Sequence, residues 1–127
     1  MRTFRFLAAA RQELLDEIRY YGAAQEGLGV RFENAVAAAV RRAVANPEHG
    51  TARSKRTRRM LVKGFPFGIV YRVTDATVLL VAVADSRRRP EYWAERLGPA
   101  GTWVTEENRL NASPVVFRWN KFDLGVA

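Results

Sequence analysis

The spacing of the apolar residues changes once along this chain, and that change limits the folds that the chain can adopt. From residue 8 to Pro47 the apolar residues recur every three or four positions, as on one side of an α-helix. Beyond Pro47 the apolar runs are short, rich in β-branched and aromatic residues, and separated by turn residues, which is typical of strands. We therefore expect an α+β protein, with helices in the first half and most of the sheet in the second.

The first half predicts a strand followed by a helical hairpin. Residues 3–6, TFRF, alternate and carry two aromatic side chains, which suits a short strand. Residues 8–24 predict an amphipathic helix, and a second helix follows the glycine-containing turn at residues 25–29. The apolar stripe of the second helix is Leu28, Phe32, Val36, Ala39, Val40 and Ala43. Because Asn46 and Pro47 stop this helix, we expect two antiparallel helices that pack through alanine-rich faces.

The second half predicts a three-stranded antiparallel meander over residues 58–63, 68–73 and 77–86. In the middle strand Ile69, Tyr71 and Val73 share one face. Val70 and Arg72 share the other, so we expect one dry and one mixed face. The last strand is apolar on both faces, which favours a central place in the sheet. The helical hairpin is expected to cover one face of this sheet.

Size and charge narrow the class of protein. The 127 residues suffice for one compact domain, and cysteine is absent, which argues against disulfides and thiolate metal sites. No apolar run approaches the roughly 18 to 20 residues of a membrane span, so we expect a cytoplasmic protein. The formal net charge of +8 favours an acidic partner: nucleic acid, an acidic protein segment or an anionic membrane surface. Composition alone does not choose among these partners.

The first basic stretch, residues 53–63, carries six cations with no acid among them. Lysine and arginine on an edge strand discourage aggregation between sheets, which is one reason for their presence. Six cations exceed that need, so we favour a role in binding a partner.

The second basic stretch, residues 87–89, leaves the last strand as three consecutive arginines. Pro90 suits the first turn of a short helix over residues 90–97, and Tyr92 and Trp93 are expected to anchor that helix to the core. At least one of the arginines is expected to pair with a nearby acid: Asp85, Glu91 or Glu95. The remaining arginines are then available to a target or to an acidic partner.

These elements carry a resemblance to a known family. Their order, together with VKGFPFGIVYRV at residues 62–73 and VLLVAVADSRRRPEYW at residues 78–93, resembles the RelE/ParE superfamily of bacterial toxins and is most similar to its ParE branch. NPEHG at residues 46–50 is also similar to the family pattern. The resemblance spans residues 3–97 and implies the toxin half of a type II toxin–antitoxin pair, which an antitoxin encoded beside it holds inactive. A homodimer and a toxin–antitoxin hetero-oligomer are the assemblies it suggests.

The two branches of the superfamily imply different activities. The ParE branch is associated with inhibition of DNA gyrase, and the RelE branch with cleavage of messenger RNA on the ribosome. Here Asp85 stands where members commonly carry histidine, and Gly68 stands where the ribonuclease branch usually has an arginine. In a ribonuclease, Arg88 and Tyr92 would be catalytic, but a carboxylate at position 85 would repel the RNA backbone. We therefore favour a ParE-like, non-catalytic toxin, with a RelE-like ribonuclease and an inactive relative that still binds antitoxin as alternatives.

The residues expected to contact the target or the antitoxin come from both basic stretches and from the strands beside them. They are Arg58, Arg59, Lys63, Arg72, Arg87, Arg88, Arg89, Tyr92 and Trp93. For Trp93 a packed anchor is favoured over a base-stacking platform. No metal site, no cofactor and no membrane partner is predicted, and His49, the one histidine, is expected in a surface turn. No helix-turn-helix spacing or zinc motif supports specific DNA readout.

Residues 98–127 extend beyond the resemblance, which divides the chain into a toxin domain at residues 1–97 and an extension of unknown role. Trp103, Phe117 and Trp119 make the extension too apolar for the usual disordered composition. It could add a strand at residues 115–119 to a sheet edge, fill the groove of the antitoxin, or be an accident of the gene boundary. We favour the added strand.

Overall fold

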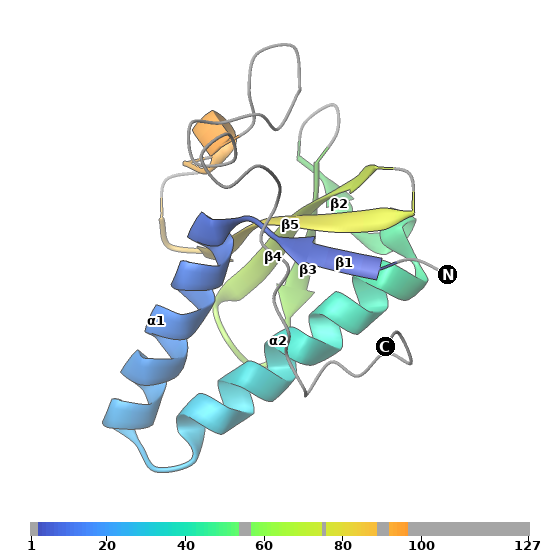
Figure 1. The fold of residues 1–127 in the computed structure, drawn as a ribbon. Helices are drawn as coiled ribbons and strands as arrows, with labels where there is room; N and C mark the ends of the chain where they lie inside the picture. Colours follow the sequence, from blue (N-terminus) through green and yellow to red (C-terminus); the bar gives the residue numbers. More distant parts are fainter. Residues whose placement is uncertain (1–2, 54–56, 75, 89–91, 97–127) are drawn as a thin grey trace.

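The computed structural model describes residues 3–53, 57–74, 76–88 and 92–96, and these residues form two layers (Figure 1). One layer is a hairpin of the helices α1 (Ala8–Ala24) and α2 (Leu28–Ala45). The other layer, in this described part of the chain, is a five-stranded sheet in the order β1-β5-β4-β3-β2. The predicted α+β class and the predicted helical hairpin are both confirmed.

The two helices approach each other closely near their connection. Gly27, in the turn, has φ 80°, a left-handed conformation that glycine adopts at little cost. Gly29, in the first turn of α2, lies against the backbone of α1, where an added Cβ would stand 2.6 Å from the Ile18 carbonyl oxygen. The absence of a side chain at Gly29 therefore sets the separation of the helices at this end of the hairpin.

The sheet contains the predicted meander. β3 (Arg58–Val62), β4 (Phe67–Thr74) and β5 (Thr77–Asp85) pair antiparallel in that order. β1 (Thr3–Phe6) pairs in parallel with the first half of β5, so β5 lies between β1 and β4. Residues 78–84 of β5 are buried, which confirms its predicted central place. β2 (Thr51–Ala52) adds an edge strand beside β3 that is too short to show a period in the sequence.

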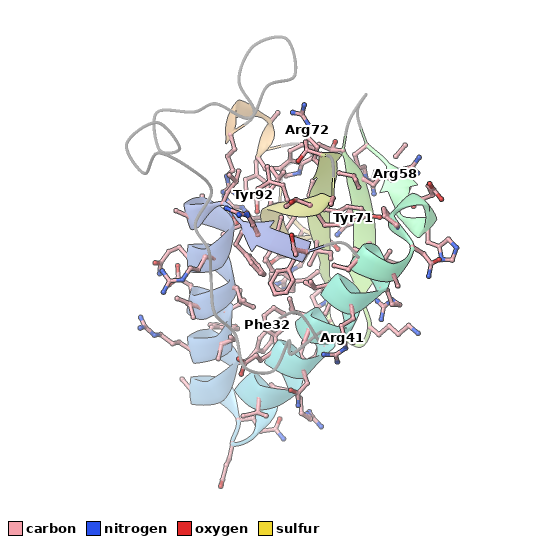
Figure 2. All side chains as sticks on the ribbon, turned by 45° about the vertical axis from the view of Figure 1, so that its right-hand side comes forward. Phe32, Arg41, Arg58, Tyr71, Arg72 and Tyr92 are labelled. Atoms are coloured by element: carbon pink, nitrogen blue, oxygen red, sulfur yellow. The ribbon has the colours of Figure 1, made fainter. Side chains whose placement is uncertain are left out.

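Aromatic residues hold the tip of the helical hairpin against the sheet. Phe32 of α2 lies 5.1 Å, between ring centroids, from Tyr21 of α1 and from Phe65 and Phe67 of the β3–β4 hairpin. Figure 2 shows Phe32 pointing between the helices and the sheet. Aromatic pairs at this separation contribute about 0.5–1.5 kcal/mol each beyond their buried area. The cluster therefore fixes which face of the sheet the helices cover.

The burial predicted for β4 is wrong at two residues near its end. Val73, predicted on the dry face, is 39 % exposed, and Arg72, predicted on the mixed face, is only 6 % exposed. The pairing with β5 shifts between Val70 and Tyr71, as at a β-bulge. The extra residue is Val81 of β5, so β4 keeps its alternation of faces, and Val73 is exposed next to the end of the strand.

A short helix is predicted for residues 90–97, and the described part of that range ends in a helical turn of the 3₁₀ type. Within the described residues this segment contains one 3₁₀ turn, η2 (Ala94–Arg96), in which the Arg96 amide donates to the Trp93 carbonyl. That bond spans three residues, so the turn is tighter than an α-helix. Arg89, Pro90, and the extension at residues 98–127 with its predicted strand at 115–119, lie outside the described residues. The 3₁₀ turn η1 (Pro47–His49) follows α2 where Pro47 is predicted to end that helix.

Candidate functional site

A hollow of about 260 Å³ lies on the face of the sheet that is turned away from the helices. Arg59 of β3 opposes Val70 of β4 on this face, whereas Phe67, three residues earlier on β4, contacts Phe32 of α2 on the other. The side chains that line the hollow are Ala52, Arg53, Arg59, Val70, Ala84, Asp85, Ser86, Arg88, Tyr92 and Trp93. The buried members of this set are apolar, and its exposed members include two arginines.

Arg59 reaches the hollow because Gly68 has no side chain. A Cβ at Gly68 would stand 2.4 Å from the Arg59 Nε, so the arginine crosses the sheet over the glycine. Its Nη2 then donates to the Ser86 hydroxyl at 2.7 Å. Burial lowers the pKa of Arg59, and the positive charge of Arg53 lowers it further. The position that departs from the ribonuclease pattern, Gly68, is therefore covered by a cation from the neighbouring strand.

Arg88 and Tyr92 meet beside the hollow. The Arg88 guanidinium carbon lies 3.9 Å from the centroid of the Tyr92 ring, close enough for a cation–π interaction. The Tyr92 hydroxyl donates to the Glu13 carboxylate at 2.5 Å, and Arg88 lies 3.6 Å from the same carboxylate. Figure 2 shows Tyr92 beside the first turns of α1, the helix that carries Glu13.

Glu13 also organises the edge of β5 beyond the point where β1 ends. Arg96 donates to both Glu13 carboxylate oxygens, at 2.8 and 3.0 Å, and to the Val81 carbonyl at 3.0 Å. The Val83 amide donates to Glu13 at 3.1 Å. These side chains satisfy backbone groups that β1 is too short to reach. The cluster thereby joins α1, β5 and η2 and fixes the position of Tyr92.

The Tyr92 hydroxyl is held in its protonated form. Burial raises its pKa well above the usual tyrosine range, and the hydrogen bond to the Glu13 carboxylate raises it further. A general base must accept a proton near neutral pH, and a hydroxyl that already donates to a carboxylate is poorly suited to that role. Tyr92 is therefore a donor and a packing residue in this structure.

Asp85 is engaged by Arg87. The guanidinium donates to both carboxylate oxygens, at 3.0 and 2.8 Å, and the Arg87 amide donates to one of them at 2.8 Å. The side-chain hydrogen bond with Arg87 is the largest cause of the lowered pKa of Asp85. Burial raises the pKa of the nearby Glu17, and the charge of Asp85 raises it further. The predicted pairing of an arginine with Asp85 is thus present in the structure.

The structure brings only part of the predicted residue set together. Arg59, Arg88, Tyr92 and Trp93 line the hollow, while Arg87 stands at its rim through Asp85. The 4 % exposure of Trp93 agrees with the packed anchor favoured from the sequence.

Three predicted binding residues lie elsewhere. Arg58 donates to the Gly50 carbonyl at 2.8 Å and so holds the turn after α2 next to Tyr71, which donates to Pro47 (Figure 2). Arg72 is buried on β4, and Lys63 is exposed in the β3–β4 turn. Arg58 is partly exposed and holds a turn, Arg72 is buried, and Lys63 is the exposed one of the three.

Sequence reasoning missed Glu13, Arg53, Ser86 and Arg96 as members of the site. Arg53 belongs to the first basic stretch, and its charge is a signal that could have found it. Glu13 has no such signal, because it lies 79 residues from Tyr92 and is one of several acids on α1. In the described part of the chain no three His, Cys, Asp or Glu side chains gather as a metal site would require. None of its helices is long and apolar enough to cross a membrane.

A helical hairpin over one face of a five-stranded sheet, with a cationic hollow on the other face, defines a small α+β domain with the architecture expected of the RelE/ParE superfamily. Residues 4–90 match the family described as ParE toxin of type II toxin–antitoxin system, parDE. The chain therefore belongs to the ParE toxin family, which confirms the resemblance.

A solved structure described as the chromosomal ParDE toxin–antitoxin system from P. aeruginosa contains a similar chain. It is 14 % identical in sequence and superimposes with a TM-score of 0.57 over 67 % of this chain and 96 % of that one. At this identity the likeness extends to the fold. No curated protein sequence matches the chain.

Proposed function

We propose that this chain is a toxin that arrests growth by inhibiting DNA gyrase in the cytoplasm, and that a cognate antitoxin neutralises it in a hetero-oligomer. Membership of the ParE toxin family over residues 4–90 supports the toxin role and the antitoxin partner. The choice of gyrase over messenger RNA as the target is supported by the state of the groups around the hollow.

The observation that carries this choice is the engagement of Tyr92 by Glu13 at 2.5 Å. Cleavage of RNA through its 2′-hydroxyl requires a proton acceptor, and Tyr92, with its raised pKa, is a poor one. Asp85, the carboxylate of the described lining, is bound by Arg87 and has a lowered pKa. The hollow therefore presents cations without an effective base, which favours binding over catalysis.

A ribonuclease is the second candidate. The convergence of Arg59, Ser86 and Arg88 on one hollow favours it, because cations of this kind could hold a phosphate during cleavage. In that mechanism Arg88 would stabilise the transition state and Tyr92 would transfer a proton. The two candidates differ in whether the loss of the Tyr92 hydroxyl abolishes toxicity.

The test is induced expression of the full chain in a bacterial host, with growth, plasmid supercoiling and messenger RNA integrity measured together. We expect growth arrest, relaxed or broken plasmid and intact messages, and we expect Tyr92→Phe to remain toxic. Purified chain should inhibit supercoiling by purified gyrase, and co-expressed antitoxin should restore growth. Cut messages that disappear with Tyr92→Phe and Arg88→Ala would establish the ribonuclease instead. Normal growth with soluble protein would indicate an inactive relative.

A further inference from the structure

The hollow contains two cations, Arg53 and Arg59, that form no ion pair with any acid in the described part of the chain. Within the described residues Arg87, Arg88 and Arg96 form ion pairs with Asp85 or Glu13, whereas Arg53 and Arg59 form none. Arg53 is close enough that its positive charge, together with burial, lowers the pKa of Arg59. Two guanidinium groups that repel each other in a partly buried site are stabilised when an anion binds between them.

The carboxylate nearest to these cations is not available to them. Asp85 lines the same hollow, but both of its oxygens accept hydrogen bonds from Arg87. In the described part of the chain, the hydrogen bond that Arg59 does make is to a neutral group, the hydroxyl of Ser86. Among the described residues, therefore, no acid is left to neutralise Arg53 and Arg59, and we look for their anion in a partner.

The size and the floor of the hollow indicate what kind of anion fits. Its volume of about 260 Å³ is below the ~300–1,000 Å³ of small-molecule pockets, so it suits one side chain better than a cofactor. Val70, Ala84 and Trp93, which are buried, supply apolar contacts below the cations. An acidic side chain with methylene groups, or an acid next to an apolar residue, matches both features.

The aromatic residues at the hollow argue against single-stranded nucleic acid. Proteins that bind single strands stack bases on exposed aromatic rings. Here one face of the Tyr92 ring is covered by Arg88, and Trp93 is 4 % exposed. The cations are accessible to a partner, since Arg53 and Arg88 are both exposed, but a platform for a base is missing among the described lining residues.

We propose that the hollow formed by Arg53, Arg59 and Arg88 receives a carboxylate side chain from an acidic segment of the antitoxin, with an apolar neighbour of that carboxylate on the Val70 and Trp93 floor. The proposal rests on the antitoxin partner of the proposed function and names the chemistry of the contact. Of the three arginines, Arg59 is held in place before the partner binds, because it is bonded to Ser86 and lies over Gly68. Arg53 and Arg88 complete the site from its rim.

The test measures binding of the full chain to the antitoxin encoded beside it, by calorimetry or surface plasmon resonance. Arg59→Met and Arg53→Met each remove one cation and keep an apolar stem, and Arg31→Met removes an exposed cation from α2 as the matched control. We expect Arg59→Met to weaken binding by about thirtyfold and Arg53→Met by about threefold to tenfold. Arg31→Met should change binding by less than about twofold. Arg53 is exposed, so the test does not depend on the folding of the Arg59 variant.

A double-mutant cycle identifies the partner group. Each Asp and Glu of the antitoxin is replaced by Asn or Gln, and one replacement should weaken binding to the wild-type chain but not to Arg59→Met. Equal binding of all toxin variants would overturn the carboxylate site and leave the toxin–antitoxin pair intact. Failure of the wild-type chain to bind the antitoxin would overturn the proposed partner itself, and this proposal with it. A 12-nucleotide RNA that binds through Arg59, with antitoxin binding unaffected, would assign the hollow to nucleic acid.

Discussion

Arg59 and Gly68 depend on each other: the arginine of β3 crosses directly over the glycine of β4, where an added Cβ would stand 2.4 Å from the arginine Nε. From this position Nη2 reaches the Ser86 hydroxyl at 2.7 Å. Because Gly68 has no side chain, the guanidinium of Arg59 extends from β3 across β4 to the residue that follows β5. Gly68, which departs from the ribonuclease pattern, therefore also makes room for the arginine that lines the hollow.

Gly68→Ala is expected to displace Arg59 and break its bond to Ser86. The Arg59 side chain can move aside only by giving up its bond to Ser86, so we expect a loss of about 1 kcal/mol in the free energy of unfolding. Urea denaturation measures it. Gly22→Ala is the control, because no atom lies within 4 Å of a Cβ at that helical position. It should leave stability unchanged or raise it by up to about 1 kcal/mol. Equal stability of both variants would contradict the dependence of Arg59 on Gly68.

Gly29→Ala is expected to separate the two helices. The added Cβ would meet the Ile18 carbonyl oxygen at 2.6 Å, and this neighbour is backbone that cannot rotate away. The helices must therefore shift, and we expect a loss of at least about 2 kcal/mol. Thermal unfolding followed by circular dichroism tests this, again with Gly22→Ala beside it. A melting temperature within one degree of wild type would show that the hairpin tolerates a wider spacing.

Glu13→Gln is expected to destabilise the chain through its partners. The carboxylate accepts hydrogen bonds from Tyr92, Arg96 and the Val83 amide, and an amide group cannot replace the charge that faces Arg96. We expect a loss of about 2 kcal/mol for Glu13→Gln and about 1 kcal/mol for Tyr92→Phe. Because both variants disturb one cluster, the double variant should lose less than their sum.

The control for this cluster is Glu26→Gln, an exposed carboxylate in the connection between the helices. Its effect should stay within about 0.5 kcal/mol. Denaturant unfolding of the single and double variants provides the comparison. Strict additivity of Glu13→Gln and Tyr92→Phe would be inconsistent with a shared cluster.

The raised pKa of Tyr92 predicts a loss of stability at alkaline pH. Its proton is bound more tightly in the folded state than in the unfolded state, where tyrosine titrates near pH ~10. The stabilising contribution is therefore complete below pH ~10 and is lost as the pH rises through the folded-state pKa. Stability of the wild-type chain should fall more steeply above pH ~10 than that of Tyr92→Phe.

Absorbance at 295 nm isolates this tyrosine when the titration of Tyr92→Phe is subtracted from that of the wild type. The subtraction is needed because burial also raises the pKa of Tyr21 and Tyr71. The difference curve should have its midpoint clearly above pH ~10. A midpoint at the ordinary tyrosine value would mean that the Glu13 contact is absent in solution.

The pattern of apolar residues was sufficient to predict the helices and the meander, because burial follows the spacing of residues along each element. Phe32 recurs with its neighbours at helical spacing and is buried, as predicted. The meander is also correct, because turns and β-branched runs are local signals. The predicted burial failed at Val73 and Arg72, which lie near the end of β4, because alternation predicts the face of a residue and not what covers that face.

The candidate site was predictable only in part. Charge density in the sequence pointed to Arg59 and Arg88, which do line the hollow, but it gave equal weight to Arg58 and Arg72, which serve the fold. Glu13 accepts hydrogen bonds from Tyr92 and Arg96 beside the hollow, but no feature of the sequence distinguishes it from the other acids of α1. Nothing in a run of residues distinguishes a carboxylate that faces solvent from one that faces a strand edge.

By itself the sequence determined the α+β class, the helical hairpin, the central place of β5 and the membership of a toxin family. Each of these depends on periodicity, turn residues or motifs, which are properties of neighbours along the chain. Only the tertiary structure decided which cations have partners and which do not. That outcome depends on contacts such as Glu13 with Arg96, which lie 83 residues apart and form only after α1 packs beside β5.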